Sequence, residues 1–194
     1  MHNLTPDVFL HVLPGCIKPE RKSKGAIGYD AGIRAIVSPF DVDEEKPYLR
    51  KTLFDFENTP DNLEIAGRVE IIKENGSKEL VYNLLPGESV TAGLGFITAM
   101  PFPLFYLMVD RSSWASKHQL KVMNAPGAID PDYRGEAGAV IKNWGDKIFK
   151  LKHNMRIVQC IFQYAIIPFF VDTPEYKNLP KTVRGAGGFG STGI

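Results

Sequence analysis

The apolar stretches of this sequence are short, and glycine or proline interrupts them throughout. The chain holds 18 glycines and 14 prolines in 194 residues. Short runs of β-branched and aromatic residues bounded by such turn formers are typical of β-strands. The runs that we expect to be strands are 8–13, 69–72, 105–109, 137–141 and 156–162. Because helical periodicity is scarce, with 112–118 the one fair candidate, the pattern predicts an all-β fold of the barrel or jelly-roll kind with a short helix.

The composition predicts a single domain spanning residues 1–194. An apolar fraction of 44% is enough to form a core. With 23 basic and 22 acidic residues, the net charge is +1, so we expect a small-molecule partner and neither nucleic acid nor a membrane. The two cysteines, Cys16 and Cys160, lie far apart and predict no disulfide framework. The first residues lack the features of a signal peptide, so we expect a cytoplasmic protein, in the host cell cytoplasm if the source is a phage or virus.

Two segments differ from the strand pattern. Segment 41–82 begins with a cluster of charged residues and continues into a hairpin-like stretch, in which Asn75 and Gly76 are a signal for a type I′ turn. The final segment, 184–194, contains five glycines and almost no apolar side chains. Since burial cannot hold it in a core, we expect a flexible Gly-rich C-terminal arm that either stays free or orders on a ligand.

The glycine-rich arm carries groups that suit a nucleotide. Closely spaced glycines allow backbone N–H groups to converge on an anion, and Arg184, Ser191 and Thr192 add charge and hydrogen bonds. Phe189 stands alone among glycines, where it has no core to join but can stack on a base. A tail without any ligand is the alternative.

A stretch rich in proline, glycine and acidic residues, 124–135, holds a candidate general base. Its Asp130 is presented at a turn, where a carboxylate can activate a water if a phosphorus centre lies within reach. An ordinary polar β-turn is the alternative, because turns favour Asp, Pro and Gly.

Two basic stretches offer ligands for phosphate. Residues 111–113 place an arginine beside two serines, and Arg156 lies in an apolar run. The donors of arginine match phosphate oxygens, although each stretch alone is equally typical of a capped turn or a strand. Near the N-terminus, the glycine-rich stretch 25–32 surrounds Asp30 and is a weak signal by itself.

In their order along the chain, these five stretches resemble the five motifs of the homotrimeric dUTPase family. They read GAIGYDAG, RSS, NAPGAIDPDYRG, RIVQCIF and RGAGGFGSTG. The likeness extends over residues 8–194 and includes the stretch 85–88 before the second motif. The resemblance implies a distorted jelly-roll/β-barrel of the dUTPase type and a homotrimer with sites shared between subunits. It also implies hydrolysis of dUTP to dUMP and pyrophosphate with Mg²⁺.

The resemblance assigns roles to individual residues. Asp130 would orient and deprotonate the water that attacks the α-phosphorus, and Tyr133 would pack against the deoxyribose and leave no space for a 2′-hydroxyl. Asn124 matches the position whose amide reads the uracil edge. An amide offers both a donor and an acceptor, so neighbouring hairpin backbone groups must fix the choice between uracil and cytosine. Asp30 would touch the water shell of a Mg²⁺ ion held mainly by the triphosphate.

The remaining motif residues would bind the other parts of the substrate. Phe189 would cover the uracil, while Ser191 and Thr192 would close over the far end of the triphosphate. The full set expected to bind substrate is Arg111, Ser112, Ser113, Asn124, Gly127, Ile129, Tyr133, Arg156, Gln159, Arg184, Gly188, Phe189, Gly190, Ser191 and Thr192.

Departures from the family pattern leave other functions open. The second motif is usually Arg-Ser-Gly in dUTPases, and Ser113 makes it the Arg-Ser-Ser of dCTP deaminases. Those enzymes place an arginine and a catalytic glutamate where this chain has Ser116 and Val140, and a valine cannot shuttle protons. Glu136 lies off that pattern, and the complete C-terminal signature favours hydrolysis. A pyrophosphatase that accepts both dCTP and dUTP is the milder alternative.

The span between Asp30 and Arg111 is long for this family, so we interpret 41–82 as an insertion. An extended solvated loop is one interpretation, because long surface insertions cost little free energy. An arm that binds a protein partner is the other. A dUTPase-fold protein that binds a nucleotide or partner without turnover is the non-enzymatic alternative, and the retained Asp130 and Arg184 argue against it.

Overall fold

The computed structural model of the chain describes residues 5–59, 62–74 and 76–187. Its strands are β1 (Phe9–Val12), β2 (Gly28–Gly32), β3 (Ala35–Val42), β4 (Arg50–Phe54), β5 (Val69–Glu74), β6 (Ser77–Leu84), β7 (Ser89–Gly93), β8 (Phe96–Ala99), β9 (Leu104–Asp110), β10 (Leu120–Val122), β11 (Gly127–Ile129), β12 (Gly138–Asn143), β13 (Phe149–Leu151) and β14 (Arg156–Tyr164). The helices are α1 (Leu63–Ala66), α2 (Ser112–His118) and the 3₁₀ turn η1 (Tyr176–Asn178). The prediction of an all-β fold with a short helix is confirmed.

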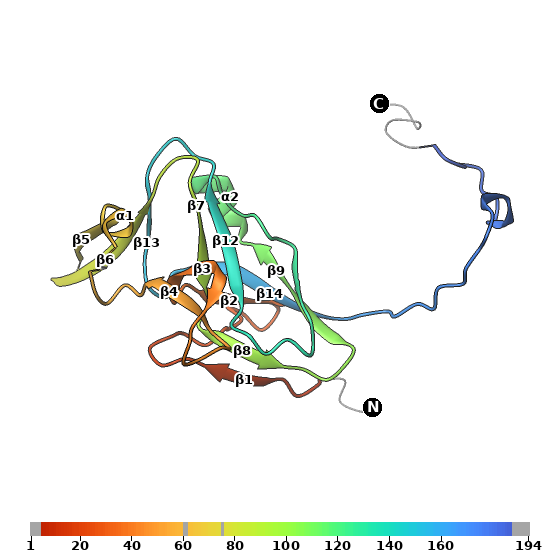
Figure 1. The fold of residues 1–194 in the computed structure, drawn as a ribbon, viewed down its shortest axis with the longest axis horizontal. Coiled ribbons are helices and arrows are strands. Elements are labelled where there is room, and N and C mark those ends of the chain that lie inside the picture. Colours follow the sequence, from red (N-terminus) through yellow and green to blue (C-terminus); the bar gives the residue numbers. More distant parts are fainter. Residues whose placement is uncertain (1–4, 60–61, 75, 188–194) are drawn as a thin grey trace.

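Antiparallel sheets form the body of the protein. The largest has the order β10-β12-β7-β3-β4, and a second has the order β11-β9-β14-β2. A three-stranded sheet, β13-β6-β5, lies at one end, and the β1-β8 pair lies along the edge of the body (Figure 1). Because the chain passes repeatedly from one sheet to another, residues distant in sequence meet in one interior.

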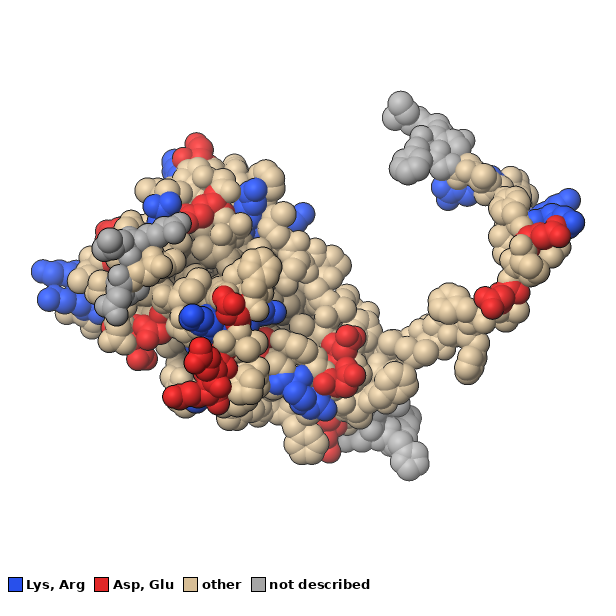
Figure 2. Space-filling model, in the orientation of Figure 1, with Lys and Arg blue, Asp and Glu red and all other residues tan. Residues whose placement is uncertain are grey.

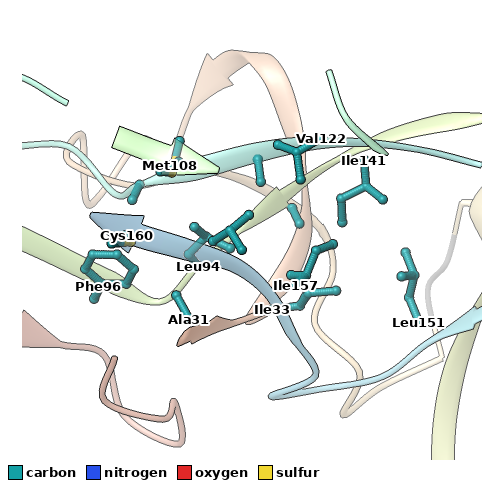
Figure 3. Packing of buried hydrophobic residues seen from close by; sticks show 14 of the residues in the cluster. Ala31, Ile33, Leu94, Phe96, Met108, Val122, Ile141, Leu151, Ile157 and Cys160 are labelled. Atoms are coloured by element: carbon teal, nitrogen blue, oxygen red, sulfur yellow. The ribbon is translucent and has the colours of Figure 1, made fainter. Parts of the chain in front are cut away.

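One apolar core joins these sheets. Ile33, Leu94 and Ile141 are at most 1% exposed and belong to the same cluster of buried side chains. Figure 3 shows side chains from β9, β12 and β14 directed into this common interior. Full burial of such a side chain contributes about 1.5–3 kcal/mol to folding.

The pattern of β12 explains why its run forms a strand. Ala139, Ile141 and Asn143 are buried, while the residues between them are partly exposed. This period of two places one set of side chains in the core and the other on the surface. β14 pairs with β9 on one side and β2 on the other, which matches its long apolar run.

The hairpin predicted in segment 41–82 is present. β5 and β6 are antiparallel, with Glu74 paired to Ser77 across a two-residue connection. Gly76 has a φ of 82°, which glycine adopts without strain, and Asn75 lies outside the described residues. The local signal therefore located the turn correctly.

Segment 41–82 is anchored in the domain at several points. β4 extends the largest sheet through its pairing with β3, and Phe54 and Val81 are 2% and 0% exposed in the core. The interpretation of the whole segment as an extended solvated loop is therefore wrong, because its strands bury apolar side chains.

The chain leaves the body after β14 (Figure 1). The amide of Ala165 donates to the carbonyl of Pro103, and beyond it the described residues are exposed apart from Gly187. Ile166, Phe169 and Phe170 are more than 90% exposed. The extended part of the chain therefore begins well before residue 184, where the sequence placed the start of the arm.

The surface mixes charges of both signs. On the face drawn in Figure 2, acidic and basic side chains lie next to one another over the body. Among the described residues, no helix has the length and apolar character needed to cross a bilayer.

Burial should protect the thiol of Cys160 from alkylation. Desolvation, with a smaller effect from the charge of Asp30, raises its pKa to about 12. In a Cys16→Ala variant, we expect iodoacetamide at pH 8 to modify Cys160 at least about a hundredfold more slowly in the native protein than in urea, because the thiolate is the reactive form. Mass spectrometry of timed samples measures both rates. Equal rates would show that this part of the core is open.

Candidate active site

A surface pocket of about 300 Å³ collects residues from both larger sheets. The residues that line it are Pro39, Arg50, Thr91, Met108, Asn124, Ala128, Ile129, Asp130, Tyr133, Glu136, Gly138 and Val140. Its wall includes half of the stretch from Asn124 to Tyr133 that the sequence singled out. The remaining wall comes from Glu136 and from strand residues outside the five motifs.

A tight turn after β11 holds Asp130 and Tyr133 at the pocket. The Tyr133 amide donates to the Asp130 carbonyl at 3.2 Å, and the Tyr133 hydroxyl donates to the Glu136 carbonyl at 3.2 Å. These two bonds hold the tyrosine ring in place, while the Asp130 side chain remains exposed. An exposed carboxylate beside a fixed aromatic ring suits activation of a water next to a flat substrate.

The amide of Asn124 is engaged by the edge of β12. Its Nδ2 donates to the carbonyl of Gly138 at 3.1 Å, and its Oδ1 accepts from the amide of Val140 at 3.0 Å. The carboxamide thus fills a donor and an acceptor that the strand presents side by side. The sequence predicted only that backbone groups of a neighbouring hairpin read the base. The Gly138 carbonyl and the Val140 amide are the candidates for those groups.

Packing and strand pairing explain two other residues of the third motif, Gly127 and Ile129. A Cβ added to Gly127 would lie 2.7 Å from the carbonyl oxygen of Asn124, so a larger residue would push the turn apart. Ile129 pairs with Tyr106 of β9 and lines the pocket.

A buried carboxylate organises the first, second and fourth motifs. Asp30, which is 1% exposed, accepts from Nε2 of Gln159 at 3.0 Å and lies 3.1 Å from Nη2 of Arg111. The second contact has the distance of an ion pair without hydrogen-bond alignment, and Asp30 Oδ2 has no hydrogen-bond partner. The Arg111 guanidinium also donates from Nη1 to the carbonyl of Arg156 at 2.8 Å. Asp30 therefore orients Arg111 and Gln159, two candidate ligands for phosphate.

The serines of the second motif begin α2. Ser112 and Ser113 are exposed on its first turn, and Trp114 donates from Nε1 to the same Arg156 carbonyl at 2.6 Å. The Arg156 side chain is partly exposed and lies 3.4 Å from Glu20. The side chains of Ser112, Ser113 and Arg156 are thus accessible beside Arg111.

Within one chain, the predicted residues form two separate groups, one at the pocket with Asp130 and one around Asp30. Asp30, Arg111, Arg156 and Gln159 do not line the pocket that holds Asp130. Arg184 lies on the extended C-terminal segment, where its Nε donates to the carbonyl of Gly187 at 2.7 Å. The remaining arm residues, Gly188, Phe189, Gly190, Ser191 and Thr192, lie outside the described residues.

Glu136 is a pocket residue that the sequence identified only as off the deaminase pattern. It is 2% exposed, and its carboxylate forms a bidentate pair with Arg34 at 2.7 and 2.8 Å and accepts from the Gly95 amide at 2.8 Å. Burial alone would lower the pKa of Arg34, but the hydrogen bond and charge of Glu136 outweigh it, so this pKa is raised. A carboxylate held in this way is not free to shuttle protons.

Arg50, Pro39, Thr91 and Met108 complete the pocket and were not predicted. They lie on β4, β3, β7 and β9, and no local pattern marks them. Only the pairing of these strands brings them to the third motif.

The described residues contain no group of three or more His, Cys, Asp or Glu side chains that could hold a metal ion. A divalent ion at this site would need oxygen ligands from elsewhere, such as the phosphates of a substrate. Asp30 Oδ2, buried without a hydrogen-bond partner, is an acceptor that fits such an arrangement beside Arg111.

A protein-family model for dUTPase matches residues 80–193. The chain belongs to the dUTPase family. The match begins at residue 80, within the last residues of segment 41–82, and the first motif, 25–32, lies before it.

Similar proteins agree with this assignment. The deoxyuridine 5′-triphosphate nucleotidohydrolase of Gloeothece citriformis is 39% identical over 109 residues, which is 56% of this dUTPase-family chain and 73% of the relative. The dUTPase of Staphylococcus bacteriophage 80alpha with dUPNHPP has a TM-score of 0.62 at 20% identity, covering 98% of this chain and 100% of that one. A mutant dUTPase from phage phi11 of S. aureus, described with a structural Mg(II) ion, has a TM-score of 0.58 at 16% identity, covering 88% and 99%. These structures establish the shared fold.

In this dUTPase-family chain, Glu136→Gln should weaken the fold. Arg34 would remain buried without a counter-charge, so we expect the free energy of unfolding to fall by about 3–5 kcal/mol. Urea denaturation at a fixed protein concentration measures the change. Glu70→Gln, which removes an exposed pair with Lys150, is the matched control and should change little. A Glu136→Gln variant as stable as this control would contradict the assigned role.

Proposed function

We propose that this protein hydrolyses dUTP to dUMP and pyrophosphate. The observation that carries the proposal is that Asp130, Tyr133 and Asn124 line one pocket, in a chain of the dUTPase family. The curated relatives named deoxyuridine 5′-triphosphate nucleotidohydrolase support the same reaction.

Asp130 would act as the general base. Its exposed carboxylate takes a proton from a water, and the water oxygen forms a bond to the α-phosphorus. The bond between the α-phosphorus and the bridging oxygen breaks, and pyrophosphate leaves with the electron pair. Tyr133, fixed by its bond to Glu136, would pack against the deoxyribose.

The edge of β12 would read the base. Gly138 offers a carbonyl acceptor and Val140 an N–H donor, and the Asn124 amide now fills both. Uracil presents the same pair, an N3–H beside a C=O, and neutral cytosine presents a matching pair in its 4-amino N–H beside N3. A uracil that uses these groups takes the place of the Asn124 carboxamide. These two backbone groups would thus hold the edge of the base, and the choice of uracil would need a further group that distinguishes a C4 carbonyl from a C4 amino group.

The triphosphate would be held by Arg111, Ser112, Ser113, Arg156, Gln159 and Arg184. The buried Asp30 orients two of these in advance, which lowers the cost of ordering them at the moment of binding. When bound with the substrate, Mg²⁺ supplies charge neutralisation on the phosphate oxygens. Asp30, whose Oδ2 lies at ion-pair distance from Arg111 but accepts no hydrogen bond, is the protein group suited to a water of that ion.

A homotrimer with shared sites would bring the separated groups together. The pocket with Asp130 and the cluster around Asp30 do not meet within one chain. The apolar side chains of Ile166, Phe169 and Phe170 are exposed on the extended C-terminal segment, and such surface is typical of a contact with another molecule. A neighbouring subunit provides both the missing half of the site and a partner for this segment.

The dCTP deaminase alternative has less support. Val140 stands where that reaction needs a glutamate, and the Glu136 carboxylate is bound to Arg34 and the Gly95 amide. Ser113 lies exposed on α2, away from the residues that line the pocket, so its effect on base choice would be indirect.

Asp130→Asn should abolish most of the activity. We expect wild-type protein with Mg²⁺ to convert dUTP to dUMP and pyrophosphate, and the variant to lose roughly 10²–10⁴-fold in kcat because the general base is gone. Ion-exchange separation of the nucleotides follows the reaction, and binding of dUMP to the variant is the control for folding. Formation of dUTP or dUMP from dCTP by the wild type would instead indicate the deaminase, and formation of dCMP and pyrophosphate the dual pyrophosphatase.

Removal of residues 184–194 should impair catalysis while the body stays folded. Loss of Phe189 stacking alone is expected to lower kcat/KM for dUTP roughly tenfold, since a base–aromatic stack contributes about 1–3 kcal/mol. Steady-state kinetics of the truncated chain measure this, with circular dichroism and oligomeric state as controls. Full activity of the truncated chain would exclude the arm from the site.

A further inference from the structure

Arg50 is a cationic side chain that β4 places in the wall of the pocket. It belongs to segment 41–82 and precedes residue 80, where the match of the dUTPase family model begins. None of the five motifs contains it. Its position raises the question of what part of the substrate it meets.

Two contacts tie β4 and the chain just before it to Glu136 and Arg34, the ion pair that supports the pocket. The carbonyl of Tyr48 accepts from the Glu136 amide at 2.8 Å, and Thr52 Oγ1 accepts from Arg34 Nη1 at 3.1 Å. Arg50 and Thr52 point to the same face of the strand because side chains alternate along it. The backbone of Arg50 is therefore held in place by residues that also support the pocket.

The guanidinium of Arg50 is oriented but largely unused. Its Nη1 donates to the carbonyl of Pro39 at 2.7 Å. Among the described residues it forms no ion pair, in contrast to Arg34, whose charge Glu136 neutralises. An arginine has five N–H donors, so most of them are available to a ligand.

The geometry also indicates which end of the pocket Arg50 occupies. A Cβ built on Gly138 would lie 3.9 Å from Arg50 Nε, so the guanidinium is next to the strand edge that binds the Asn124 amide. This is the edge assigned above to the base. Arg50 therefore lies at the base end of the pocket.

We propose that Arg50 donates to the C4 carbonyl of uracil and thereby selects dUTP over dCTP. The inference rests on the proposed function. A guanidinium has donors and no acceptor, so it matches the C4=O of uracil. Cytosine carries an amino group at C4, and two donors would face each other there without a bond, which disfavours binding. Segment 41–82 would thus contribute directly to substrate choice.

Arg50→Gln tests this proposal, with Arg50→Lys as a second variant that keeps the charge. The control is Lys51→Gln, an exposed neighbour on the same strand that does not line the pocket. We expect Arg50→Gln to reduce the ratio of kcat/KM for dUTP over dCTP about tenfold or more, mainly through the KM for dUTP, since a hydrogen bond to a charged group is lost. Arg50→Lys should lose part of the ratio and Lys51→Gln none.

The affinities of dUMP and dCMP, measured by calorimetry, make the test independent of turnover. A wild type that prefers dUMP, and an Arg50→Gln variant that has lost this preference, would support the proposal even if no hydrolysis were seen and the proposed function failed. An unchanged preference in both Arg50 variants would overturn it while leaving dUTP hydrolysis intact. Equal weakening of dUMP, dCMP and pyrophosphate binding would also overturn it, because Arg50 would then hold phosphate. Thermal melting identifies a variant that is misfolded, in which case Arg50→Lys decides.

Discussion

The pocket depends on one buried residue, Glu136. Its carboxylate binds Arg34 and the Gly95 amide, its own amide holds β4 through Tyr48, and its carbonyl accepts the hydroxyl of Tyr133. Four separate stretches of chain therefore meet at a single position. Because a buried carboxylate is stable only when its partners are in place, these contacts form together or not at all.

The carboxylates around the candidate site divide their tasks according to burial. Glu136 and Asp30 are enclosed and bound by arginine and amide groups, so they orient other side chains. Asp130 is exposed at the tip of a turn, where it can meet a water. Preorganised donors around a mobile reactant are what hydrolysis of a charged phosphoanhydride bond requires.

Local signals predicted much of the fold, and long-range pairing determined the rest. The β5–β6 turn at Gly76 and the helix Ser112–His118 follow from neighbouring residues. Resemblance to the family predicted the motif residues, and the pairing of Gln159 with Asp30 across β14 and β2 brings two of them together. Arg50 could not be predicted in this way, because the pairing of β3 with β4 shifts register between Val37 and Val42 and no periodic pattern encodes such a shift.

The bond pattern of Asn124 has a consequence for the thermodynamics of binding. The Gly138 carbonyl and the Val140 amide are both bound by the chain's own Asn124 carboxamide. A base that enters therefore exchanges one amide pair for another, and the hydrogen bonds gained and lost nearly cancel. The net affinity for a base must therefore come from contacts with its ring and from charge. An inhibitor that copied only the amide edge of uracil would have to displace the Asn124 side chain, which belongs to the same polypeptide.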